Sequence, residues 1–407
     1  MKLTNCRNCE SKKIINIFSL GNLYFTGKFP KKNSTVKKGP INVVMCKKCK
    51  LLQLGDNFNM KYLYGPDYGY QTGINATMTK HVKNIVKKLS KKVRLKKNNL
   101  VLDIASNDGT LLNFYNKNIV TFGIDPLVNK FLSNYKKINY KVSDFFSAQK
   151  VKNIITNKKF KIITALSVFY DLRKPNKFLS DVENILDKNG IFLLEFADLA
   201  SIVKLNMFDT FCHEHLEYYS LNVVKKMCKV NNLRIFDISS NNINGGSSQI
   251  FICKKKAIYS TNKLNIKKFF TIEKKLKLDK KTTFIKFFKK INSIRDDLLY
   301  FLKREKNKNK IIHCYGASTK GNVLLQYFKI DNKIIDYAAE RNSKKYNLLT
   351  PGSKIKIISE KKSRALLPDY YLVLPWHFKS EILKREKIAI KKGSKFIFPL
   401  PTMSINS

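Results

Sequence analysis

The sequence predicts an α/β protein with two open sheets and a small metal-binding module in front of them. Three observations support this fold class: strand and helix patterns alternate between residues 99 and 196, the alternation restarts at residue 310, and two Cys-x-x-Cys pairs stand near the N-terminus. Buried strands that alternate with helices are typical of a parallel sheet with helices on both faces. A chain of 407 residues is expected to form two or three domains.

Residues 1–60 are predicted to form a zinc-ribbon module. Its ligands would be the cysteines of C-R-N-C and C-K-K-C, namely Cys6, Cys9, Cys46 and Cys49. Two tight turns can bring four thiolates into the tetrahedron that Zn2+ accepts in structural sites, where no coordination position is left open for catalysis. The alternative, a pair of redox dithiols, is disfavoured because no thioredoxin-like βαβ pattern surrounds the cysteines.

A second domain, predicted over residues 61–256, begins with the aromatic loop Y-L-Y-G-P-D-Y-G-Y-Q-T-G and an amphipathic helix at 78–89. Short apolar runs predict buried strands, and amphipathic patterns predict the helices between them. The expected elements are, in order, strand 99–105, helix 109–116, strands 120–124 and 161–165, helix 175–186 and strand 191–196.

The lysine-rich stretch 257–309 is predicted to be a mostly helical connector. After it, residues 310–407 repeat the alternation and predict a second α/β domain. The expected elements are strand 310–315, helix 320–328, strands 334–339 and 370–374, helix 381–391 and strand 395–398.

Composition and charge narrow the class of protein. Hydrophobic residues make up 43% of the chain, which is enough for several cores. No apolar run approaches the ~20 residues of a membrane span, and the N-terminus leads into a cysteine pair, so we expect a cytoplasmic protein that binds no membrane. The net charge of +50 comes mostly from lysines spread along the whole chain. Nucleic-acid sites are typically localised and rich in arginine, so we expect no specific nucleic-acid partner.

The strand at 99–105 ends in a turn of small residues that carries two acids. A dinucleotide site would have G-x-G-x-x-G here, so an oxidoreductase is disfavoured. An acid beside small residues suits S-adenosylmethionine, which is positively charged and has no phosphate. Asp125 would then accept hydrogen bonds from the ribose, and Asp144 would lie near the adenine. Each lone aspartate could instead be a helix cap or a turn. The predicted cofactor-binding residues are Asp103, Ala105, Ser106, Asn107, Asp108, Gly109, Asp125 and Asp144.

Residues 209–220, D-T-F-C-H-E-H-L-E-Y-Y-S, hold two of the five histidines of the chain, His213 and His215, with Glu214 between them. Histidine exchanges protons near neutral pH. In a strand, both histidines would lie on one side and Glu214 on the other. The spacing is not H-E-x-x-H and no third ligand is obvious, so a general base with a neighbouring carboxylate is favoured over a metal site. The alternative is a set of structural hydrogen-bonding groups at a domain junction.

In the last domain, residues 315–322 read Y-G-A-S-T-K-G-N, a strand, a small-residue turn and the start of a helix. Backbone N–H groups at a helix N-terminus bind anions readily, and Lys320 could add charge toward a diphosphate. A plain strand-to-helix connection is the alternative.

Taken together, these motifs make the chain resemble the bacterial sugar C-methyltransferase family. The resemblance covers nearly the whole length and includes C-R-N-C, C-K-K-C-K-L-L-Q-L, Y-G-Y-Q-T-G-I-N-A-T-M, I-A-S-N-D-G-T-L-L, F-D-T-F-C-H-E-H-L-E-Y-Y-S, G-G-S-S-Q-I-F-I, G-A-S-T-K-G-N-V-L-L, L-T-P-G-S-K-I and L-P-W-H-F. It implies a zinc-binding N-terminal domain, a class I methyltransferase domain and a Rossmann-like C-terminal domain.

The resemblance also implies a reaction. The substrate would be a nucleotide-linked keto-deoxysugar, used for surface polysaccharide or lipopolysaccharide. His215 would remove the proton at C3, next to a ketone at C4, with Glu214 assisting and His213 nearby. The enolate carbon would then attack the methyl group of S-adenosylmethionine. Substrate contacts are expected from Tyr68, Tyr70, Cys212, Ser318, Lys320 and Asn322.

Two positions depart from the family pattern. Ala105 stands where relatives usually have glycine. Cys212 stands where they often have tyrosine, so the sugar that is bound could differ from the sugars of the better-known relatives. Two other functions stay open at this point: an RNA methyltransferase that uses the basic surface, and an inactive, zinc-stabilised binding protein. Two α/β lobes around one cleft are compatible with a monomer.

Overall fold

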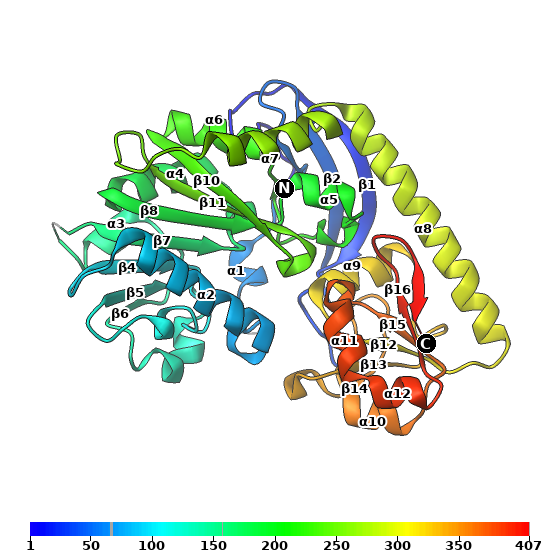
Figure 1. Ribbon diagram of the computed structural model, residues 1–407. Helices are drawn as coiled ribbons and strands as arrows, with labels where there is room; N and C mark the ends of the chain where they lie inside the picture. Colours follow the sequence, from blue (N-terminus) through cyan, green and yellow to red (C-terminus); the bar gives the residue numbers. More distant parts are fainter. Residues whose placement is uncertain (66–67, 157, 407) are drawn as a thin grey trace.

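Three β-sheets organise the computed structural model, which describes residues 1–65, 68–156 and 158–406 (Figure 1). The N-terminal sheet has the order β1-β2-β3-β9, the central sheet β10-β11-β8-β7-β4-β5-β6 and the C-terminal sheet β14-β13-β12-β15-β16-β17. The predicted fold class, an α/β chain with a cysteine-bearing module in front of two larger sheets, is confirmed.

The N-terminal sheet is antiparallel and is completed by a strand from the middle of the chain. Its strands are β1 (Ile14–Tyr24), β2 (Lys38–Cys46), β3 (Leu52–Leu54) and β9 (Glu217–Tyr218). In the register of the last pair, Leu52 lies opposite Tyr218. This pairing attaches the segment after His215 to the N-terminal module.

The central sheet carries parallel strands in its middle and one antiparallel hairpin at its edge. The parallel strands are β4 (Leu100–Ile104), β5 (Val120–Ile124), β6 (Tyr140–Val142), β7 (Phe160–Leu166) and β8 (Leu186–Phe196), and the hairpin is β10 (Leu233–Asn241) with β11 (Ser247–Lys254). The helices around it are α2 (Ala76–Val93), α3 (Ala148–Lys152), α4 (Pro175–Ile185), α5 (Leu199–Lys204), α6 (Leu221–Val230) and α7 (Lys263–Leu276).

Helices cover both faces of this sheet because neighbouring strand residues point to opposite sides. Ile162 of β7 joins the core under α2, together with Val82. The next residue, Ile163, joins the opposite core with Phe178 of α4.

The C-terminal sheet is parallel except for its last strand. Its strands are β12 (Ile312–Tyr315), β13 (Tyr337–Glu340), β14 (Ile357–Ser359), β15 (Tyr370–Val373), β16 (Lys395–Phe398) and the antiparallel β17 (Ser404–Asn406). Its helices are α9 (Thr319–Tyr327), α10 (Glu360–Ala365), α11 (Lys379–Arg385) and α12 (Lys387–Lys391). The long helix α8 (Lys281–Asn307) leads into this domain along the outside of the molecule (Figure 1).

Two predicted helices differ from the observed ones. The helix expected at 109–116 is only a short 3-10 turn, Leu112–Phe114. The amide of Asn113 donates to the carbonyl oxygens of Gly109 and Asn134, and such side-chain bonds compete with a regular helix. The helix expected at 381–391 is divided at Glu386, whose buried carboxylate accepts hydrogen bonds from Tyr315 and Arg364.

Within the residues that the structure describes, no helix combines the length and the apolarity that a membrane span needs.

Candidate active site

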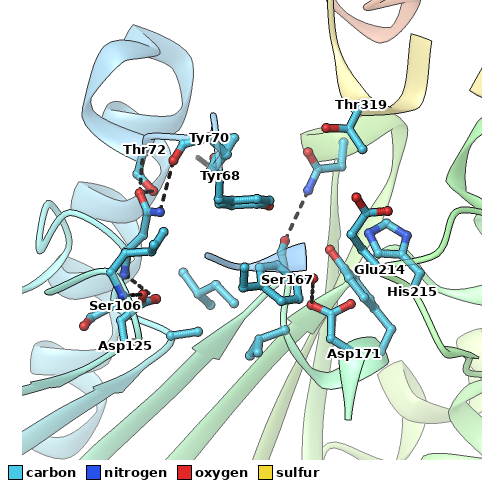
Figure 2. Close-up of a pocket in the computed structure, with 18 of the residues that line it drawn as sticks. Tyr68, Tyr70, Thr72, Ser106, Asp125, Ser167, Asp171, Glu214, His215 and Thr319 are labelled. Carbon is cyan, nitrogen blue, oxygen red and sulfur yellow. Dashed lines mark hydrogen bonds between the residues drawn. The ribbon is translucent and has the colours of Figure 1, made fainter. Parts of the chain in front are cut away.

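A cavity of about 700 Å3 opens where β4, β5 and β7 end, and all three parts of the chain line it (Figure 2). Strand ends in open α/β sheets are the usual place for ligands. Ser106 and Asp125 lie on one side in Figure 2, while Asp171, Glu214 and His215 lie on the other. Further lining comes from residues within 59–64 and 68–82, from the start of α9 and from the turn after β15. The cavity therefore has two ends that a cofactor and a second small molecule could share.

At the first end, the turn after β4 is held in left-handed backbone conformations. Ala105 has φ +58°, Asn107 +50° and Gly109 +74°. Glycine and asparagine adopt this region readily, whereas alanine is strained there by roughly 1 kcal/mol. Two backbone N–H groups donate to Asp125: that of Asn107, in this turn, to Oδ2 at 3.0 Å, and that of Leu127, just after β5, to Oδ1 at 2.7 Å. The Asp125 carboxylate is thereby fixed at the edge of the cavity.

Asp103 lies near the C-terminal end of β4 and lines the same end of the cavity. Its Oδ1 accepts a hydrogen bond from Thr164 Oγ1 at 2.6 Å. Burial raises the pKa of Asp103 to about 7, and the hydrogen bond from Thr164 opposes the rise. A carboxyl group with this pKa gains strongly from a nearby positive charge.

Asp108 and Gly109 do not line the cavity. Asp108 instead ties the aromatic loop to the turn, because its Oδ2 accepts from Gly73 N at 2.9 Å. Asn107 does the same with Thr72 N at 2.9 Å. Part of that loop, residues 66–67, lies outside the described residues.

The structure does not bring Asp144 into the cavity. Its half-exposed carboxylate pairs with Lys150 at 2.5 Å, and the following residue, Phe145, lines the cavity in its place. The sequence order of acids at strand ends could not reveal this, because β6 is only three residues long and the chain turns outward after it.

At the second end, His215 presents a neutral imidazole. Its Nδ1 donates to the carbonyl oxygen of Thr210 at 2.8 Å, which leaves the lone pair on Nε2. Its ring lies 4.2 Å, centre to centre, from the ring of Tyr170. Burial, and after it the positive charge of Lys320, lowers the pKa of His215 to about 3. The ring is therefore unprotonated near neutral pH and is free to accept a proton.

Glu214 lines the cavity beside His215. Thr26 Oγ1 donates to its Oε2 at 3.4 Å, while Oε1 is buried without a hydrogen-bond partner among the described residues. Burial raises the pKa of Glu214. An unpartnered carboxylate oxygen at a cavity wall is available to a polar ligand group.

His213 lies away from the cavity, and the strand geometry expected around it is wrong. Residues 213–214 form a turn, so the two histidines point in different directions. His213 is fully buried against the rings of Phe25 and Phe58, at 4.5 and 4.8 Å, and its Nε2 donates to Gly39 O at 3.0 Å. Its contacts are those of a packed structural side chain.

The predicted substrate residues divide into two groups. Tyr68, Tyr70, Ser318 and Lys320 line the cavity. Cys212 is buried outside it, where burial raises the pKa of its thiol well above the usual value. Asn322 is also buried outside it and donates to the carbonyl oxygen of Thr26 at 2.7 Å.

Several residues that line the cavity are not among those predicted from the sequence. Asp171 is the clearest: its Oδ2 accepts from Tyr64 Oη at 2.7 Å, and its Oδ1 is buried without a partner among the described residues. Burial raises its pKa well above the ordinary value. Thr319, Asn244 and His377 also line the cavity. Thr319, in Y-G-A-S-T-K-G-N, and His377, in L-P-W-H-F, stand in motifs that the sequence singles out, whereas Asp171 and Asn244 do not.

The four N-terminal cysteines come together as their spacing predicts. Their sulfur atoms all lie within 4.8 Å of one another, with 3.5 Å between Cys6 and Cys49 and between Cys9 and Cys46. Zn–S bonds of ~2.3 Å in a tetrahedron place sulfur atoms ~3.8 Å apart, so the cluster fits a structural zinc ion.

Comparisons with known proteins agree with this arrangement. Residues 6–64 match a family model described as a zinc binding domain, residues 74–238 a methyltransferase domain, and residues 242–401 a C-methyltransferase C-terminal domain. The chain is 24% identical over 405 residues to the C-methyltransferase NovU of Streptomyces niveus, covering 98% of this chain and 96% of that protein.

Solved structures match less of the chain. An S-adenosylmethionine-dependent methyltransferase from Clostridium acetobutylicum is 15% identical, covers 43% of this chain and 92% of its own, and has a TM-score of 0.35. Magnesium protoporphyrin IX methyltransferase from Synechocystis, with bound S-adenosylmethionine, is 14% identical and has a TM-score of 0.34. The match covers 48% of this chain and 89% of that protein. From the family models and the full-length relative, the chain is a three-domain, S-adenosylmethionine-dependent C-methyltransferase with a zinc-binding N-terminal domain, similar to NovU.

Proposed function

We propose that this C-methyltransferase acts on a nucleotide-activated keto-deoxysugar and methylates carbon C3, next to a ketone at C4. The observation that carries the proposal is His215: a neutral imidazole, held through Nδ1, in the same cavity as Asp103 and Asp125. A carbon atom next to a ketone becomes a nucleophilic enolate carbon when it loses a proton, so C-methylation at C3 needs such a base within reach of the acceptor.

The cofactor end fits S-adenosylmethionine, which supplies an electrophilic methyl group on a sulfonium. Asp125, with both carboxylate oxygens anchored by backbone N–H groups, would bind the ribose hydroxyls. Asp103 would face the positively charged part, because its buried carboxyl group is stabilised in the ionised form by a cation.

At the acceptor end, Nε2 of His215 would take the C3 proton, and the electrons of the C–H bond would move into the enolate. Glu214 and Asp171 each keep a buried oxygen that has no hydrogen-bond partner in the described part of the chain, which suits hydrogen bonds to hydroxyl or amino groups of a sugar. The enolate carbon then attacks the methyl group, and alignment of the two reacting centres at ~3 Å supplies much of the rate.

Deuterium exchange tests the proposal. Nucleotide-linked 4-keto-deoxysugars are incubated with the protein in heavy water, first without and then with S-adenosylmethionine. We expect deuterium at C3 without the cofactor and a C3-methylated product with it. The His215→Asn variant should lose at least ~100-fold of the exchange rate, as is typical for a general base, and still bind the cofactor. Methyl transfer to a hydroxyl group or to RNA, without exchange at C3, would overturn the proposal.

A further inference from the structure

Lys320 brings a positive charge from the C-terminal domain into the cavity. It lies in the first turn of α9, whose N-terminus is capped by Ser318: the Ser318 hydroxyl accepts from Gly321 N at 3.0 Å. Its side chain lines the cavity together with His215 and His377. Its Nζ donates to the carbonyl oxygen of Asn244, in the 3-10 turn Ile243–Gly245, at 3.2 Å. This bond spans from one domain to the other.

The acceptor of that bond is itself held firmly. Asn244 has φ +56°, and its Nδ2 donates to Ser167 Oγ at 3.2 Å at the end of β7. The neighbouring Gly245 is packed so closely that a Cβ there would lie 3.1 Å from the Trp376 ring. The ammonium group is thus fixed in place, and its one hydrogen bond among the described residues leaves two N–H donors for a ligand.

Several titratable groups lie around His215 and Lys320. Tyr170, Asp171, Glu214 and His377 line the same cavity, and Asp209 lies behind it with its Oδ2 bonded to Trp376 Nε1 at 2.9 Å.

The charge of Lys320 acts on both cavity histidines. After burial, which is the larger cause, it lowers the pKa of His215 and of His377, each to about 3.

We propose that Lys320 is the charge partner of the base: its ammonium group lies in the same cavity as His215 and binds the acceptor oxygen that becomes negative when His215 removes the carbon-bound proton. The proton goes to Nε2, and the C–H electron pair forms the enolate. The new C–C bond then forms as the bond from the methyl carbon to sulfur breaks. This inference rests on the proposed function, because it takes His215 as the base, and it gives Lys320 a different task from the contact to a diphosphate that the sequence predicts.

The electrostatic half can be tested without any substrate. Imidazole C–H signals of the five histidines are followed by NMR from pH 3 to 8, with His215→Asn to assign His215. We expect His215 of the wild type to titrate only at the acid end of this range, because its pKa is about 3. In Lys320→Met its titration should move to higher pH, since one of the two causes that lower its pKa is removed. Superimposable His215 curves would overturn the inference, whatever the acceptor is.

The catalytic half uses C3 deuterium exchange. Loss of a single group that stabilises a developing oxyanion typically costs about 10²- to 10³-fold in rate, and we expect this loss for Lys320→Met. Its exchange rate should also begin to fall at a higher pH than that of the wild type. Lys320→Arg keeps the charge and should recover most of the loss. Lys361→Met, an exposed lysine on α10 of the same domain, is the matched control and should exchange like the wild type.

The outcomes separate the two proposals. No exchange in the wild type overturns the proposed function. Exchange in the wild type, with a Lys320→Met rate within threefold of it or with an unshifted pH profile, overturns the role of Lys320 alone. Cofactor affinity of the variant close to that of the wild type shows that it is folded.

Discussion

Single residues decide which acids and histidines of this chain belong to the cavity. The strand-end position of Asp103 and Asp125 can be predicted from apolar runs followed by small residues, and the structure brings both to the cavity. The local pattern does not distinguish His213 from His215, which only the family resemblance singles out, because it is the turn at residues 213–214 that sends one ring into the core and the other into the cavity. Likewise, no local sequence pattern predicts that the carboxylate of Asp144 pairs with Lys150.

Asp103 leads to a prediction about the pH dependence of cofactor binding. Its pKa is about 7 because it is buried, so it is largely protonated below pH 7 and ionised above it. A cationic cofactor favours the ionised form, and the affinity for S-adenosylmethionine should therefore rise with pH, by up to about tenfold per unit below pH 7. Titration calorimetry between pH 6 and 8 measures this. The Asp103→Asn variant should bind weakly at every pH, with a flat profile.

The matched control for Asp103 is Asp144→Asn, which removes a carboxylate from an exposed ion pair outside the cavity. Its profile should follow that of the wild type. An affinity that is independent of pH in the wild type, or a dependence that survives in Asp103→Asn, would contradict the assignment.

At the scale of elements, the zinc module supports the segment that carries His215, the proposed base. Arg7, between two cysteines of the cluster, donates to the carbonyl oxygens of Leu54 and Asp56, both at 2.8 Å, and to Leu216 O at 3.3 Å. Leu216 follows His215 directly, and its carbonyl also accepts from Leu54 N at 2.8 Å. The cysteine spacing predicts the cluster, whereas β9 is a two-residue strand that pairs with β3 from more than 160 positions away, which no local pattern reveals.

Removal of zinc should therefore lower the rate of methyl transfer more than it lowers the affinity for S-adenosylmethionine. We expect Cys49→Ser, or chelation of the metal, to lower methyl transfer at least ~10-fold, because Arg7 and β9 lose their support. The affinity for S-adenosylmethionine should change less than ~3-fold, since β4 and β5 lie in another sheet. Activity and cofactor binding are measured on the same samples, and Cys228→Ala, a buried cysteine of α6, is the control. Parallel loss of both, or of neither, would contradict the coupling.

For the whole molecule, one apolar core runs through the N-terminal sheet, α8 and the C-terminal sheet, so that the parts that close the cavity are held together. Phe18 of β1, partly buried, packs against this core. Its ring stacks on Phe288 at 4.7 Å and meets Phe211 edge-on at 5.2 Å, while Phe287 lies 6.1 Å from both Phe18 and Phe211. The alternation of strands and helices predicts each sheet separately, but residues this far apart in sequence become neighbours only in the folded chain.

Phe287→Ala should lower the stability of this shared core, and the parts that share it should still unfold together. Phe287 is 4% exposed, and truncation of such a buried ring typically costs about 3–5 kcal/mol of unfolding free energy. Urea unfolding is followed by circular dichroism and by the release of zinc to a coloured chelator. Both transitions should move together to a lower urea concentration, because the ring packs between Phe18 of the zinc module and Phe211, in the segment that leads to His215.

The control is Tyr300→Ala. Tyr300 lies on the same helix and is 71% exposed, so its truncation should change the free energy of unfolding by less than about 0.5 kcal/mol. Zinc release that stays at the wild-type urea concentration while the remaining signal shifts would mean that the zinc module folds independently of α8.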